Sequence, residues 1–224
     1  MKEQELYNLF ADLLDYPSGK IQEPLQADLL ASHYPQVSEL INEFFDFIAQ
    51  TPIPRLEEIY TSTFDLNPTC YPYVGYQLFG DGYQRGEFLV KLKEKYQENG
   101  FSYEAQELAD HLTIVLRFLA TLSPDDNLTQ EMLKDGLIPA LEKIQEGFKD
   151  NNAYHQLLAA LLLIIKSKIH QRQGDGRPLP PQAPNPPETR GWAPLAPPST
   201  PPDKTRGFSP LPTSSKKGEN DDSQ

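Results

Sequence analysis

The chain of 224 residues has a formal net charge of −12 and a single cysteine. A negative field repels nucleic acid and anionic lipid and favours basic peptides, although acidity can also serve solubility alone. One cysteine excludes an internal disulfide and a zinc site made of several cysteines, and it fits a reducing compartment. From the negative charge we expect a protein that does not bind nucleic acid. We also expect it to be cytoplasmic, since residues 1–5 lack the basic and apolar regions of a secretory signal.

The prolines divide the chain into two unequal parts. Of the 22 prolines, 13 follow residue 170. The stretch 178–212 has no apolar periodicity, so it would bury too little surface to offset its ordering entropy. Almost all Leu, Ile, Phe and Tyr come before it, which is ample for one hydrophobic core. We expect an all-helical domain over residues 1–170 and a disordered, proline-rich tail over 171–224.

Apolar residues recur at helical spacing in the first third of the chain. Each run stops at proline, glycine or asparagine, residues that commonly end helices. The expected helices cover residues 2–15, 22–31, 37–48 and 56–64. The next segment, 69–83, is rich in tyrosine and glycine and has no regular pattern, which predicts a structured loop with room for one helical turn.

The rest of the domain continues the helical pattern, with helices expected over residues 84–99, 104–122, 128–148 and 154–169. Asn99-Gly100 is typical of a left-handed helix end, and Asn151 or Asn152 is expected to cap the last helix. Leu108 is expected to be buried within the second of these helices. No segment alternates with the period of a strand, which predicts an all-α fold, a single globular bundle of seven to eight helices.

The most apolar helix is too short to cross a bilayer. Its longest apolar run, Leu157–Ile165, has nine residues, whereas a membrane span needs about 20. The run therefore predicts a buried core helix and no direct membrane insertion.

Motifs of metal, nucleotide or covalent chemistry are weak in this sequence. A metal site in a bundle needs paired Glu-x-x-His motifs, whereas Glu107 and His111 are four positions apart and have no second copy. Gly80-Asp81-Gly82 lacks the preceding strand and the third glycine of a dinucleotide site. Cys70 could be activated by His111, but a lone cysteine near prolines is more often inert. We expect no catalytic residue, no metal and no cofactor.

Two places in the sequence are candidates for a binding site. Asp110 and His111 are adjacent at the start of a strongly apolar helix, where partial burial would perturb their titration. Alternatively, one of them caps that helix or crosses to a neighbour. The second place is a cluster of aromatic residues beside prolines, which suits the packing of an apolar peptide, although about half of them are expected only to fill the core. Its members are Tyr71, Tyr73, Tyr76, Phe79 and Tyr83.

Four motifs in a fixed order connect these two places. They are Glu58-x-Tyr60-x-x-x-Phe64-Asp65, Pro72-Tyr73-x-Gly75-Tyr76, Gly80-Asp81-x-x-x-Arg85-Gly86 with the helix after it, and Glu107-Leu108-x-Asp110-His111-Leu112. In this order the motifs resemble those of the NarJ/TorD/DmsD family of molybdoenzyme assembly chaperones, over roughly residues 5–165. Tyr76-Gln77-Leu78-Phe79 stands where NarJ-like members commonly have an acidic residue and a histidine, which leaves the branch open.

The resemblance implies a cytoplasmic chaperone that is not an enzyme. Its partner would be the apo catalytic subunit of a molybdenum-dependent reductase, nitrate reductase or a relative, held by a basic and apolar N-terminal leader, often of the twin-arginine type, until the molybdenum cofactor is inserted. The residues expected at the peptide groove are Tyr73, Tyr76, Arg85, Asp110 and His111. Arg85 could instead tie the loop to the helix through a carboxylate. The protein would be a monomer or a domain-swapped dimer. The alternative is a helical adaptor or permanent subunit of a membrane-bound reductase complex.

Overall fold

The computed structural model describes residues 1–17, 25–104, 107–148 and 152–174. Within these residues the chain is helical, and β-pairing is limited to one isolated bridge between Tyr73 and His111. The predicted all-α fold is confirmed. The last described helix continues past residue 170 to Gly174. The tail expected over 171–224 therefore lies, from residue 175 on, outside the described residues.

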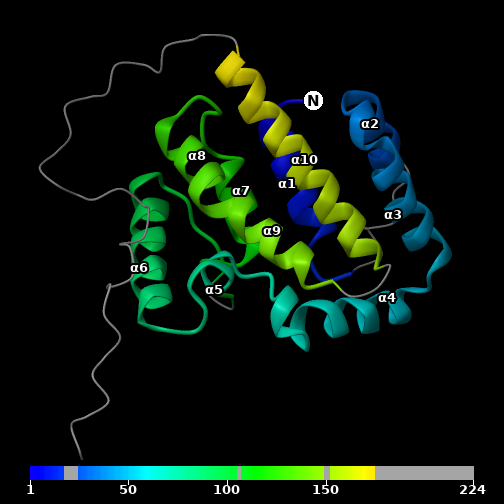
Figure 1. Cartoon of the computed structure of the whole chain (residues 1–224), viewed down its shortest axis with the longest axis horizontal. Helices are drawn as coiled ribbons and strands as arrows, with labels where there is room; N and C mark the ends of the chain where they lie inside the picture. Colours follow the sequence, from blue (N-terminus) through cyan, green and yellow to red (C-terminus); the bar gives the residue numbers. More distant parts are fainter. Residues whose placement is uncertain (18–24, 105–106, 149–151, 175–224) are drawn as a thin grey trace, which may run out of the picture. The chain divides into compact units, whose positions relative to one another are not determined.

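The helices follow the apolar pattern of the sequence and are arranged around a central helix, α10 (Figure 1). Among the described helices, none is long and apolar enough to cross a membrane. Their bounds are α1 Glu3–Leu13, α2 Leu25–His33, α3 Ser38–Gln50, α4 Ile53–Tyr60, α5 Val74–Phe79, α6 Tyr83–Glu98, α7 Leu112–Leu119, α8 Asn127–Glu131, α9 Ile138–Glu146 and α10 Ala153–Gly174.

Helix α10 packs against α3 and α9, and its apolar run is buried in the core except at Leu163, which is 47% exposed. Asn152 caps it as expected, since its side-chain oxygen accepts a hydrogen bond from the Tyr154 amide at 3.0 Å. The Tyr154 ring lies within 5.7 Å of Phe44, Tyr60 and Phe64, measured between ring centroids. These edge and tilted contacts join α10 to α3 and to the end of α4.

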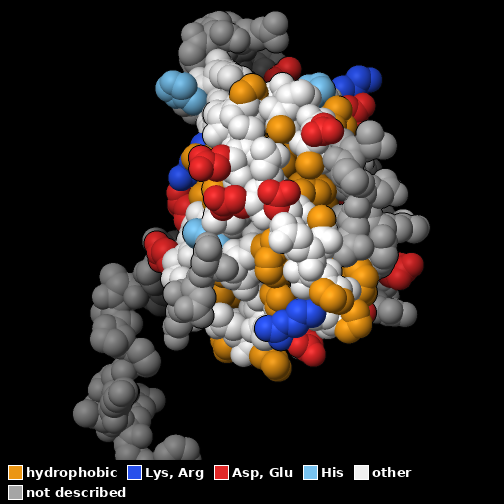
Figure 2. Space-filling view, turned by 90° about the vertical axis from the view of Figure 1, so that its right-hand side faces the viewer, with side chains coloured by type: hydrophobic (Ala, Val, Ile, Leu, Met, Phe, Trp, Pro, Cys, Tyr) orange, Lys and Arg blue, Asp and Glu red, His pale blue; other side chains and the backbone are white. Residues whose placement is uncertain are grey.

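Helix α3 shows why the apolar stripes became helices. It buries Ile41, Phe44, Phe45 and Ile48 on one face and leaves its acidic residues exposed on the other. Figure 2 shows the face of the molecule that lies at the right of Figure 1, where acidic side chains gather next to hydrophobic ones. Helix α3 is therefore acidic on its outer side and apolar on its inner side.

Two of the expected helices contain a π-helical turn. Thr61–Asp65 continues α4, and Met132–Leu137 lies between α8 and α9. The segment expected as one helix over 128–148 is thus divided into α8, the π turn and α9. A π turn adds one residue to the helical repeat and shifts the buried face that follows it.

The helix expected over 104–122 begins later than the sequence indicated. Residues 110–112 pair with 72–74 instead: the Val74 amide donates to the Asp110 carbonyl at 2.8 Å, and the Leu112 amide donates to the Pro72 carbonyl at 2.7 Å. His111 consequently has extended backbone angles and precedes the first turn of α7. The expected burial of Leu108 is wrong for the same reason, since 43% of it is exposed.

The segment expected as a loop over 69–83 contains α5 and a short 3-10 turn, Pro68–Cys70. The helix after it, α6, matches the expected bounds closely. Gly100 has φ 65°, so the predicted left-handed residue after α6 is confirmed. The tyrosine-rich segment is thereby held between the bridge on one side and α6 on the other.

Candidate functional site

The bridge between residues 73 and 111 brings together two segments that are far apart in the sequence. The rings of Tyr73 and His111 meet edge to face, with centroids 5.2 Å apart. The residue before this bridge, Asp110, points into the protein and has no exposed surface. The two places singled out in the sequence therefore form one structural unit.

Arg85 reaches Asp110 from the first turn of α6. Its Nε lies 2.9 Å from Oδ2 of Asp110, and its Nη2 lies 3.2 Å from Oδ1. A planar guanidinium matches a carboxylate in this two-bond geometry. The pair matters because a buried carboxylate without a partner would be strongly unfavourable. A second carboxylate, that of the exposed Asp81, lies 3.9 Å from Nη1.

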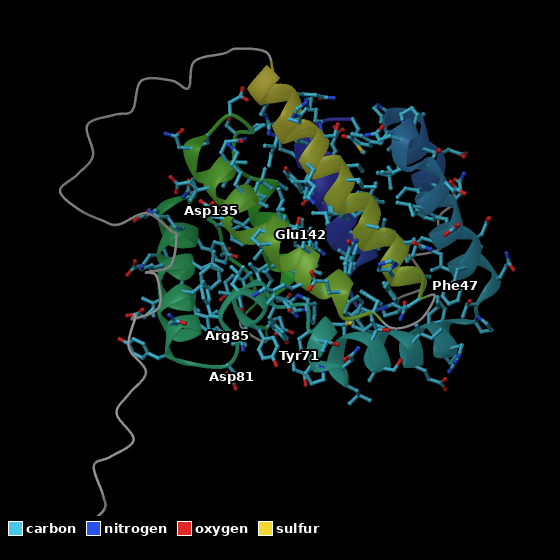
Figure 3. The ribbon with its side chains drawn as sticks, viewed as in Figure 1. Phe47, Tyr71, Asp81, Arg85, Asp135 and Glu142 are labelled. Atoms are coloured by element: carbon cyan, nitrogen blue, oxygen red, sulfur yellow. The ribbon has the colours of Figure 1, made fainter. Side chains whose placement is uncertain are left out.

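The guanidinium of Arg85 also lies between two tyrosine rings. Its central carbon is 5.2 Å from the centroid of Tyr73 and 5.6 Å from that of Tyr76. Both distances suit a cation–π contact. The ring of Tyr71 in turn lies 5.2 Å from that of Tyr76. Figure 3 shows Tyr71, Arg85 and Asp81 on the same side of the molecule, close to α5 and α6.

We call the half-buried rings of Tyr71, Tyr73 and Tyr76 the tyrosine surface. Acidic groups border it: Asp81 beside Arg85, and Glu107, whose Oε1 accepts a hydrogen bond from the Tyr73 hydroxyl at 2.9 Å. Burial and this hydrogen bond raise the pKa of Tyr73, so its hydroxyl stays protonated and acts as a donor. The surface thus offers aromatic area together with negative charge.

Burial keeps the imidazole of His111 neutral. It is 7% exposed, and burial lowers the pKa of its imidazole despite the nearby carboxylates of Glu107 and Asp110. Its Nδ1 lies 2.8 Å from the Thr113 hydroxyl. The imidazole therefore fixes the orientation of the Tyr73 ring from one side, while Arg85 packs on that ring as well.

Gly75 is a residue of this site that sequence reasoning named only as part of a motif. A Cβ at this position would lie 2.7 Å from a ring carbon of Phe88 and 2.8 Å from Oδ2 of Asp110. Both neighbours are buried. Only glycine leaves room for the Asp110 carboxylate here. The one feature of the sequence that could have indicated this is a glycine within the tyrosine-rich segment. The sequence likewise pointed to Glu107 only as part of a motif and as a weak metal ligand.

The residues considered for covalent or metal chemistry are placed elsewhere or engaged otherwise. Cys70 is buried, its sulfur lies 3.2 Å from the Asn67 side-chain nitrogen, and burial raises the pKa of its thiol. His111 instead contacts Thr113 and Tyr73. Within the described part of the chain, His, Cys, Asp and Glu nowhere gather in a group of three or more that could hold a metal ion.

All the residues expected at a peptide groove lie together in this unit. Tyr73 and Tyr76 flank Arg85, Arg85 binds Asp110, and His111 contacts Tyr73. The tie between Arg85 and a carboxylate, considered from the sequence as an alternative, is present. Asp110 is fully buried, so any effect that it has on a ligand passes through Arg85 and the tyrosines.

Comparison with known proteins places this unit in a family. Residues 30–157, which include the whole unit, match the family model described as nitrate reductase delta subunit. The chain belongs to this family. The resemblance inferred from the four sequence motifs is thereby confirmed.

Curated relatives include assembly chaperones of bacteria. The chain is 27% identical over 167 residues to the probable nitrate reductase molybdenum cofactor assembly chaperone NarJ of Bacillus subtilis, covering 73% of this chain and 90% of that protein. It is 26% identical over 157 residues to the corresponding NarJ of Escherichia coli K12, covering 67% of this chain and 65% of that protein. The chain thus spans just under two thirds of the Escherichia coli relative's length.

Among solved structures, a putative redox enzyme maturation protein from Archaeoglobus fulgidus has the same fold. The two superpose with a TM-score of 0.55 at 22% sequence identity, covering 74% of this chain and 95% of that one. The likeness supports the α-helical fold and says nothing about function.

Proposed function

We propose that the protein is an assembly chaperone for a reductase that contains the molybdenum cofactor, either nitrate reductase or a relative. It binds the N-terminal segment of the apo catalytic subunit in the cytoplasm and assists cofactor insertion before export or membrane attachment. It performs no reaction of its own. Membership of the nitrate reductase delta subunit family and the assembly-chaperone names of its relatives support this proposal.

The proposed binding site rests on the placement of Arg85 against the rings of Tyr73 and Tyr76. Arg85, His111 and Glu107 contact Tyr73, and Arg85 and Tyr71 contact Tyr76. These contacts hold the rings in place before any ligand arrives, so binding requires little further ordering of the protein. A leader segment is basic and apolar. Its apolar residues would pack on the tyrosines, and its basic residues would pair with Asp81 and Glu107 at the border.

In this proposal Arg85 and Asp110 are positioning residues. The two-bond ion pair fixes the guanidinium, and the guanidinium fixes both rings. A client peptide has to order on binding, which costs part of the interaction free energy. A preformed aromatic surface offsets that cost because only one partner has to become ordered.

The test begins with affinity capture of the tagged full-length chain from cells that express the reductase. The expected partner is a catalytic subunit that lacks its molybdenum cofactor. A synthetic peptide of the captured subunit's N-terminal segment is then titrated calorimetrically into the full-length protein. Tyr76→Ala should weaken binding at least about tenfold, the loss expected for an aromatic anchor.

Phe47→Ala provides the matched control, because Phe47 is also a half-buried aromatic residue and lies at the right of the molecule in Figure 3, apart from Tyr71 and Arg85. It should leave the affinity unchanged, and circular dichroism should show that both variants keep their helices. Equal weakening by both variants would contradict the proposed site. Recovery of the chain in the purified mature enzyme would favour the alternative, a permanent subunit.

A further inference from the structure

The C-terminal sequence contains a short repeat that the proposed function does not use. Thr189-Arg190-Gly191-Trp192 recurs as Thr205-Arg206-Gly207-Phe208. Each copy places one arginine two positions before an aromatic residue. The first copy also holds the only tryptophan of the chain. Both copies lie beyond the described residues.

The chemistry of the first copy complements the tyrosine surface. That surface presents half-buried rings with the carboxylates of Asp81 and Glu107 at its border. An indole is the aromatic group best suited to packing on other rings, and an arginine pairs readily with a carboxylate. Arg190 and Trp192 therefore carry the same two properties, positive charge and apolar area, that the proposed client segment requires.

The chain between the domain and this copy is long enough to reach the surface. Fifteen residues separate Gly174, the end of α10, from Arg190. At about 3.3 Å per residue they extend to roughly 50 Å. A folded domain of this size has a radius of gyration of about 16 Å. The linker is therefore longer than the diameter of such a domain, about 40 Å, and lets the first copy reach surfaces well away from the end of α10.

We propose that Thr189–Trp192 binds the tyrosine surface as an internal competitor of the client segment. This inference rests on the proposed function, because it assigns regulation to the same surface. A segment tethered by a short linker has an effective concentration on the order of 1 mM. With an intrinsic Kd on the order of 0.1 mM, typical of a short and weak contact, it would lower the apparent affinity for a client about tenfold. A weakly bound client would be rejected, and a tightly bound one would displace the segment.

The fluorescence of Trp192 tests the docking directly in the full-length protein. Because the chain has one tryptophan, the emission reports on this segment alone. In the native protein the emission should be blue-shifted relative to the unfolded chain and protected from acrylamide. Tyr76→Ala should shift it to the red and raise acrylamide quenching about twofold, whereas Phe47→Ala should leave it unchanged. Emission that matches the unfolded chain, or that ignores Tyr76→Ala, would overturn the proposal.

A second measurement uses a synthetic peptide of residues 186–195 as the probe. Calorimetry measures its binding to two variants, because one of them retains the emission of Trp192. The peptide should bind the Arg190→Ala/Trp192→Ala variant about tenfold more tightly than the Arg206→Ala/Phe208→Ala variant, which keeps the first copy. Equal affinity for the two variants would refute internal competition.

Competition with the N-terminal peptide of the captured catalytic subunit separates the two proposals. Displacement of the 186–195 peptide supports both. If the client peptide binds without displacing it, the inference fails and the chaperone function stands. If the 186–195 peptide binds and the client peptide does not bind at all, the docking stands and the proposed function of the surface is contradicted.

Discussion

Replacing Gly75 by alanine should destabilise the protein through the site that Asp110 occupies. The added Cβ would lie 2.7 Å from Phe88 and 2.8 Å from the Asp110 carboxylate, well inside ordinary van der Waals contact. Phe88 is 4% exposed and Asp110 is fully buried, so neither can move aside into solvent. Overpacking of this kind costs about 1–3 kcal/mol.

Part of this cost is offset because alanine is the better helix former. Gly75 lies within α5, where alanine gains about 0.5–1 kcal/mol over glycine. The midpoints of these two ranges leave a net loss of about 1 kcal/mol in the free energy of unfolding, which lowers Tm by roughly 2–4 °C in a protein of this size. Thermal unfolding of the full-length protein, followed by circular dichroism, measures it.

Gly86 supplies the matched control. It also lies within a helix, α6, but a Cβ there would meet no atom within 4 Å. Gly86→Ala should raise the free energy of unfolding by up to about 1 kcal/mol. A Gly75→Ala protein that unfolds at or above the wild-type Tm would refute the account of how the Asp110 carboxylate is accommodated.

Other predictions concern the contacts around the bridge. Arg85→Ala leaves Asp110 buried without its partner and should lower the free energy of unfolding, measured by urea denaturation, by about 3–5 kcal/mol. Adding Asp110→Ala should restore part of that loss, and a double variant whose loss equals the sum of the two single losses would contradict the pairing. Burial lowers the pKa of His111, so as pH drops the imidazole is protonated in the unfolded chain before it is protonated in the folded one, and stability should fall below about pH 6.5. His111→Gln should reduce that fall between pH 7.5 and 5.5, and an unchanged pH dependence would speak against a buried neutral imidazole. Tyr96→Phe removes a hydrogen bond of 2.8 Å to the Ala109 carbonyl and should cost about 1 kcal/mol. Tyr154→Phe should be neutral or stabilising by up to about 1 kcal/mol, since its buried hydroxyl has no hydrogen-bond partner among the described residues; the opposite order of these two variants would contradict both assignments.

The sequence predicted the helices where the apolar period is continuous and local. The expected and observed bounds agree for α3 and α6, because each buries one face and ends at a residue that stops helices. The start of α7 could not be read in this way. Residues 110–112 are extended because they pair with 72–74, and a pairing across nearly 40 positions leaves no trace in local periodicity.

The candidate site was predicted as a set of residues but not as a geometry. The order of the motifs predicted that one site contains Tyr73, Tyr76, Arg85, Asp110 and His111. These residues lie together in the structure. The partner of Arg85 remained open between a ligand and a carboxylate of the protein, because residue type alone does not fix it. The burial of Asp110 depends on the space beside Gly75, which only the packed structure reveals.

Site-specific photo-crosslinking tests the binding claim most directly. A benzophenone analogue of phenylalanine replaces Tyr71 on the tyrosine surface or, as the control, Phe47, which lies apart from Tyr71 at the right of the molecule (Figure 3). After irradiation of cells that express the reductase, mass spectrometry identifies the crosslinked segment. We expect position 71, and not position 47, to crosslink to the N-terminal segment of the cofactor-free catalytic subunit. Crosslinks from position 47 alone, or from position 71 only to other parts of that subunit, would contradict the proposed role of this surface.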